Sequence, residues 1–144
     1  MKEQQFIEQL QNEQIVAAIS VAEAKTSGEI RIFISRKETS DPLAAAQEEF
    51  TRMGMTRTSE RNGVLIFVAP RSQKFAIIGD KGINERCGEN FWHEVAEDMA
   101  AHFKKAEFTE GIVSAIHKAG TLLAEHFPRR TGDQNELPDA VERD

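Results

Sequence analysis

The sequence lacks the features that mark secreted, membrane-spanning or nucleic-acid-binding proteins. Its single cysteine, Cys87, rules out an intramolecular disulfide, so nothing implies an oxidising compartment. The longest apolar run covers only residues 64–69, far fewer than a membrane-spanning helix requires. The first residues show no basic stretch followed by an apolar one, so we expect no secretory signal. These absences predict a soluble, cytoplasmic protein without membrane insertion.

A net basic charge is also missing. The formal net charge is −6, with 18 Lys and Arg against 24 Asp and Glu. Because nucleic-acid binding needs basic groups facing the phosphates, this balance argues against a nucleic-acid partner, and it is compatible with cation binding. A chain of 144 residues with 40% hydrophobic residues can bury its own core. We expect one domain over residues 1–128 and an acidic tail over residues 129–144.

Hydrophobic periodicity predicts alternating helices and strands. A helical pattern ends near Lys25, and Gly28 is expected to take the left-handed conformation that often follows a helix. Asp41 followed by Pro42 marks the start of the next helix, as N-cap and first helical residue. Strands are predicted over residues 29–35, 64–69 and 75–79, and further helices over residues 89–105 and 109–127.

This order of elements predicts an α/β fold. We expect a three-layer α/β/α sandwich, with a mixed, mostly parallel sheet and helices on both faces. The first two strands should be parallel, because a right-handed crossover through the Asp41 helix joins them. The turn at Pro70 should make the third strand antiparallel to the second, with Val64 opposite about Gly79.

The predicted topology gathers polar side chains at one end of the sheet. Glu29 begins the first strand and Asp80 follows the third, while Arg61 and Asn62 directly precede the second. Two carboxylates and an amide oxygen are hard ligands of the kind that Ca²⁺ and Mg²⁺ prefer. Arg61 could instead orient a phosphate through a bidentate contact. A solvated ion pair at a loop is the simpler interpretation of the same residues.

Several short strings resemble the TPM domain family, in the family's order and over about residues 15–139. They are TSGEI (26–30), RNGVLI (61–66), IGDKGI (78–83), FW (91–92), the Phe and Gly-Ile of 108–112, and NELPD (135–139). The chain resembles the short, soluble, stand-alone bacterial members more than the thylakoid-lumen, photosystem II repair or receptor-modulator members. The resemblance implies an α/β/α sandwich with a cleft that binds divalent metal, chiefly Ca²⁺. Some members are reported as acid phosphatases, and others are accessory factors in membrane-complex repair or receptor assembly.

Carried onto this sequence, the resemblance falls on the same polar residues that the topology gathers. Glu29, Asn62 and Asp80 are the candidate metal ligands. Glu136 and Asp139 would join them if residues 135–139 fold back over the cleft. We expect no other cofactor than Ca²⁺ or Mg²⁺.

Two functions follow as hypotheses. The first is a Ca²⁺- or Mg²⁺-binding accessory protein that acts through this acidic cleft and a protein partner, such as a membrane-complex or assembly protein. The alternative is a metal-dependent, acid phosphatase-like enzyme that uses a metal-activated water, in which any catalytic role falls to Arg61, Asp80 and Glu29. No Cys-x5-Arg loop is present, and His93-Glu94 lacks the second histidine of a zinc protease because Glu97 takes its position. The missing nucleophile favours the binding role.

Overall fold

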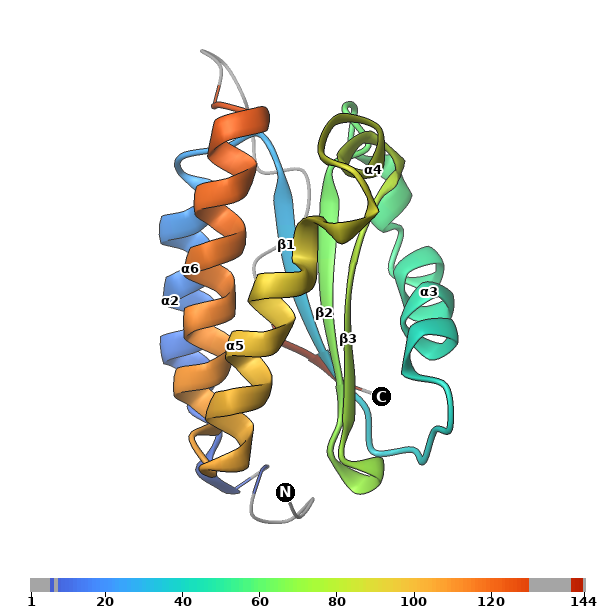
Figure 1. Ribbon diagram of the computed structural model, residues 1–144, viewed down its shortest axis with the longest axis vertical. Coiled ribbons are helices and arrows are strands. Elements are labelled where there is room, and N and C mark those ends of the chain that lie inside the picture. Colours follow the sequence, from blue (N-terminus) through green and yellow to red (C-terminus); the bar gives the residue numbers. More distant parts are fainter. Residues whose placement is uncertain (1–5, 7, 130–140, 144) are drawn as a thin grey trace.

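The computed structural model describes residue 6, residues 8–129 and residues 141–143 of the chain. The helices are α2 (Asn12–Glu23), α3 (Pro42–Arg52), α4 (Lys81–Cys87), α5 (His93–Lys104) and α6 (Phe108–His126). The strands are β1 (Glu29–Ile34), β2 (Gly63–Ala69), β3 (Lys74–Gly79) and β4 (Val141–Arg143). Figure 1 shows α2, α5 and α6 on one face of the sheet and α3 on the other. The predicted α/β/α sandwich is confirmed.

The sheet has the strand order β3-β2-β1-β4. β1 runs parallel to both of its neighbours, and β3 runs antiparallel to β2. Val64 lies opposite Gly79, as the turn at Pro70 predicted, and Glu29 lies opposite Gly63 in the parallel pairing of β1 with β2. The start of β1, the start of β2 and the end of β3 therefore meet at the same end of the sheet.

Side-chain alternation along the central strands divides the core into two halves. Ile30, Ile32 and Ile34 of β1 pack in the larger half, beneath α2, α5 and α6. Phe33 and Phe67 lie in the smaller half beneath α3, with parallel rings whose centroids are 5.8 Å apart. β1 and β2 are buried along their whole length, as central strands covered on both faces should be.

One predicted helix end is confirmed and one predicted backbone conformation is wrong. Asp41 caps α3, because its carboxylate accepts a hydrogen bond of 3.1 Å from the backbone N–H of Ala44. Gly28 does not take a positive φ. A Cβ at Gly28 would lie 3.2 Å from the carbonyl oxygen of Asn62. The glycine therefore allows close packing of two loops instead of a left-handed turn.

Three elements differ from the sequence-based prediction. The helix predicted over residues 89–105 is divided, with a 3₁₀ turn at Glu89–Trp92 followed by α5. α4 was not predicted, and neither was β4, which adds Val141 of the tail to the sheet opposite Ile32. Val141 also packs against the larger half of the core, so residues 141–143 belong to the folded unit. No helix of the described residues has both the length and the apolar character needed to cross a membrane.

Candidate functional site at one end of the sheet

Three of the predicted site residues are buried at the end of the sheet where β1 and β2 begin. The exposed fractions are 2% for Glu29, 1% for Asn62 and 7% for Asp80. The backbone N–H of Glu29 donates to the carbonyl of Asn62 at 3.4 Å, and that of Asp80 donates to the carbonyl of Gly63 at 2.9 Å. The predicted gathering of these residues is observed, and their role as ligands stays a prediction.

Arg61 and Asp80 form a bidentate ion pair at this end of the sheet. Nε of Arg61 donates to Oδ2 of Asp80 at 2.7 Å, and Nη2 donates to Oδ1 at 3.0 Å. Oδ1 also accepts the backbone N–H of Lys81 at 2.8 Å, so Asp80 is the N-cap of α4. The hydrogen bond from Arg61 to Asp80, and then their charge attraction, raise the pKa of Arg61. Both oxygens of Asp80 are therefore engaged.

Asn62 lies in a second, adjoining set of hydrogen bonds. Its Nδ2 donates to Oγ of Ser27 at 3.1 Å and to Oε2 of Glu60 at 3.4 Å. Ser27 itself donates to Glu60, and the backbone N–H of Asn62 donates to Oγ1 of Thr58 at 3.1 Å. Oδ1 of Asn62 is buried and has no hydrogen-bond partner among the described residues. A buried oxygen without a hydrogen-bond donor favours the binding of a group that takes its lone pairs, such as a hydrogen-bond donor or a cation.

The loop before β2 is held against α4 through the backbone. The N–H of Gly82 donates to the carbonyl of Arg61 at 2.8 Å, and the N–H of Arg61 donates to the carbonyl of Thr58 at 3.2 Å. Arg61 has a φ of 52°, in the left-handed region that few residues other than glycine adopt. A Cβ at Gly82 would lie 2.2 Å from the carbonyl oxygen of Glu60. Glycine at position 82 is therefore required for the loop to approach α4.

A cavity of about 320 Å³ adjoins Asp80 on the α3 side of the sheet. Its polar lining comes from two sides, with Gln47 and Thr51 on α3 and Lys81 and Asn84 on α4. Asp80 lies at the base of α4 as its N-cap. The site therefore has open space next to Asp80, the carboxylate whose two oxygens are both hydrogen-bonded.

The donor set fits a hard cation under one condition. No three or more His, Cys, Asp and Glu side chains are arranged to hold a metal within residues 8–129 and 141–143. Calcium and magnesium also accept amide, carbonyl and water oxygens, so Glu29, Asn62 and Asp80 form a suitable partial set. The unpaired Oδ1 of Asn62 fits such an ion. Asp80 fits only if it exchanges Arg61 for the cation, because both of its oxygens are already bonded.

Other predicted or considered residues lie elsewhere. Glu136 and Asp139 are outside the described residues. His93 forms an exposed pair with Glu97, at 3.0 Å on the same helix. Ser27 and Glu60 were missed as members of the cluster, although Ser27 stands within the TSGEI string that led to Glu29.

Sequence reasoning also missed a second polar cluster, which joins α5 to α6. Oγ of Ser114 donates to Asp98 at 2.7 Å, and Nζ of Lys118 lies 3.2 Å from the same carboxylate. His102 lies 3.9 Å from Asp98. The hydrogen bond from Ser114, with smaller contributions from Lys118 and His102, lowers the pKa of Asp98. The sequence did carry a signal for this cluster. Residues 98 and 102, and likewise 114 and 118, are four apart, so each pair lies on one face of its helix.

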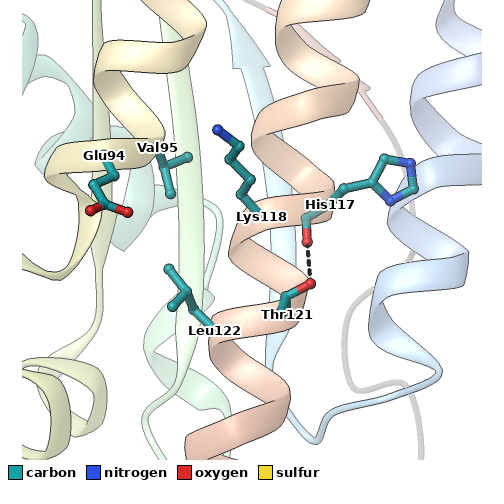
Figure 2. A pocket seen from close by; sticks show the side chains of 6 residues that line it. All are labelled: Glu94, Val95, His117, Lys118, Thr121 and Leu122. Atoms are coloured by element: carbon teal, nitrogen blue, oxygen red, sulfur yellow. Dashed lines mark hydrogen bonds between the residues drawn. The ribbon is translucent and has the colours of Figure 1, made fainter.

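A cavity of about 320 Å³ lies beside this second cluster (Figure 2). It is lined by Glu94, Val95, His117, Lys118, Thr121 and Leu122. Lys118 is paired with Asp98, and the hydroxyl of Thr121 donates to the carbonyl of His117 at 3.0 Å. Two polar groups of this lining, Lys118 and Thr121, thus have partners within α5 and α6.

The fold and the polar end of the sheet define the class of this protein as a TPM-type α/β/α sandwich. The family model described as the TPM domain matches residues 1–122. The chain therefore belongs to the TPM domain family.

Two solved structures resemble the chain. The NMR structure of BA42, from the psychrophilic bacterium Bizionia argentinensis, is 38% identical with a TM-score of 0.86, over 94% of this chain and 96% of that one. The N-terminal domain of a P. gingivalis protein is 13% identical with a TM-score of 0.63, over 84% of this chain and 82% of that one, which shows a shared fold alone. No curated protein matches.

Proposed function

We propose that this protein binds a divalent cation, Ca²⁺ or Mg²⁺, at the polar end of its sheet, and acts as an accessory module toward a protein partner. The observation that carries the proposal is the oxygen Oδ1 of Asn62, which is buried without a hydrogen-bond partner among the described residues. Glu29 begins β1 and Asp80 directly follows β3, so both residues stand at the same end of the sheet, with the start of β2 between them. Carboxylate and amide oxygens together are suited to these cations.

In such a site, the protein's own hydrogen bonds would position the ligand residues Asp80 and Asn62. Asp80 is placed by two backbone hydrogen bonds, one to the carbonyl of Gly63 and one from the N–H of Lys81. Asn62 is oriented by its amide nitrogen, which bonds to Ser27 and Glu60 and leaves its oxygen free to coordinate. A bound cation would supply positive charge that offsets the buried carboxylates.

A binding role is better supported than catalysis by the described residues. The one cysteine, Cys87, is a poor nucleophile because burial raises the pKa of its thiol, which keeps it protonated near neutral pH. An accessory module of this kind would act by presenting its cation-ordered loops to another protein.

A phosphohydrolase is the second candidate. The observation in its favour is Arg61, whose side chain is 42% exposed and stands beside the carboxylate that borders the 320 Å³ cavity. In this role Arg61 would orient a phosphate, and a metal-activated water would attack it. Phosphate release from a generic ester that is unchanged in Asp80→Asn would contradict this candidate.

Isothermal titration with Ca²⁺ and, separately, Mg²⁺ tests the cation proposal. We expect one site per chain for at least one of the two ions, weakened about tenfold or more in Asp80→Asn. The amide of Asn at position 80 still accepts the Lys81 N–H, so the substitution removes charge and keeps the cap.

The matched control is Asp41→Asn. Asp41 is the N-cap of α3 as Asp80 is of α4, and it lies away from the cluster. Its substitution should leave the affinity unchanged. Absence of binding heat with both ions in the unmodified protein, or equal loss in the two variants, would contradict the proposal.

A further inference from the structure

The ion pair at the candidate site presents an obstacle to any incoming cation. Arg61 donates two hydrogen bonds to Asp80, one to each carboxylate oxygen, at 2.7 and 3.0 Å. The backbone N–H of Lys81 adds a third at 2.8 Å. A cation that takes an oxygen of Asp80 as ligand must therefore displace part of this arrangement.

The two partners of the pair differ in how firmly they are held. The side chain of Asp80 is 7% exposed and is fixed by the cap of α4. The side chain of Arg61 is 42% exposed, so its guanidinium already contacts water and becomes fully hydrated on leaving Asp80. Arg61 is thus the partner that can move.

The backbone of Arg61, by contrast, is fixed. Its N–H and carbonyl are bonded to Thr58 and Gly82, at 3.2 and 2.8 Å. Its φ of 52° is maintained by that packing. Movement of the guanidinium therefore needs rotation of the side chain alone, while the loop that also carries Asn62 stays in place.

Resting on the proposed function, we propose that Arg61 is the internal counter-ion of the cation site. Its guanidinium neutralises Asp80 while the site is empty, and it swings out when a divalent cation takes its place. A buried carboxylate without any positive partner is costly, so this exchange keeps the empty protein stable. Cation binding is then a competition between the guanidinium and the ion, and removal of the guanidinium strengthens it.

The test is calorimetric titration with Ca²⁺ of the unmodified protein, Arg61→Gln, Arg61→Lys and Arg57→Gln. We expect Arg61→Gln to bind about tenfold more tightly than the unmodified protein. Arg61→Lys keeps the charge and loses the bidentate fork, so it should fall between the two. Arg57→Gln removes the same charge from an exposed position four residues earlier and should change the affinity less than about threefold.

A second readout follows Arg61 directly. The Nε–H resonance of Arg61 should shift on saturation with Ca²⁺ toward its position in Asp80→Asn, where the ion pair is absent. Thermal unfolding of each variant checks that it is folded.

The outcomes separate the two proposals. Equal or weaker binding by Arg61→Gln, compared with Arg57→Gln, overturns the counter-ion role and leaves the cation site standing. Tighter binding by Arg61→Gln than by both the unmodified protein and Arg57→Gln supports the counter-ion role. Absence of binding in every variant overturns both.

Discussion

Two aspartates of this protein, Asp80 and Asp98, are both paired with a basic side chain and bonded to a second donor, yet they are held in different ways. Asp98 lies within α5 and takes its partners Ser114 and Lys118 from the facing helix α6. Asp80 lies at a strand end and takes Arg61 from a loop. The helical cluster is set by helix periodicity, whereas the loop cluster depends on close backbone packing. This difference separates a stabilising cluster from a candidate binding site.

The largest expected effect concerns the backbone packing itself. Gly82→Ala places a Cβ 2.2 Å from a backbone carbonyl oxygen, which cannot yield without moving the loop. We expect a loss of about 3 kcal/mol in the free energy of unfolding. Chemical denaturation measures it.

The matched control lies in the helical region. Gly111→Ala places a Cβ 2.9 Å from Cβ of His102 and 3.1 Å from the ring of Phe103, and it gains helix propensity. We expect a loss at least about 1 kcal/mol smaller than for Gly82→Ala, because the clash at 2.9 Å is less severe than that at 2.2 Å and the helix propensity offsets part of the cost. Equal losses would erase the distinction between loop and helix packing.

An intermediate effect is expected from Asp98→Asn, through pH. The pKa of Asp98 is lowered in the folded protein, so its contribution to stability is complete above its unfolded value of about 3.9 and is lost as the pH falls through the folded value. The contribution should be about 1 kcal/mol at neutral pH. Unfolding curves of the variant should therefore depend less on pH below about pH 4 than those of the unmodified protein. The same pH dependence below about pH 4 in the variant and the unmodified protein would contradict a lowered pKa of Asp98.

The smallest effect distinguishes the two partners of Asp98. The hydrogen bond from Ser114 is the largest single cause of the lowered pKa, whereas Lys118 acts through a hydrogen bond and a charge and is 49% exposed, so that water screens it. Ser114→Ala should therefore raise the pKa of Asp98 more than Lys118→Met does. NMR titration of the Asp98 carboxyl carbon measures both, and the reverse order would show that charge outweighs the hydrogen bond at this position.

Much of the fold could be predicted because local signals agree with the topology. The turn at Pro70 sets Val64 opposite Gly79, and Asp41 with Pro42 starts α3. β4 was missed because three residues carry too little pattern to read. α4 was missed because its seven residues begin beside Gly82, which resembles a loop in sequence.

The candidate site was predictable in its location but not in its contacts. Strand register brings Glu29 and Asp80 to one end of the sheet whatever the loops do. The Arg61–Asp80 pair depends instead on a loop residue with a φ of 52°, which no periodicity encodes. The Ser27–Glu60–Asn62 hydrogen bonds likewise join two loops through contacts that depend on side-chain orientation.

The central claim is that a divalent cation binds at the loop cluster and not at the helical one. The most direct measurement is the amide NMR spectrum of the protein titrated with Ca²⁺ and with Mg²⁺. With at least one of the ions, we predict progressive shifts at Asn62, Gly63, Lys81 and Gly82, while Ser114 and His102 stay in place. Shifts confined to the helical cluster around Asp98, or no shifts with either ion, would contradict the account.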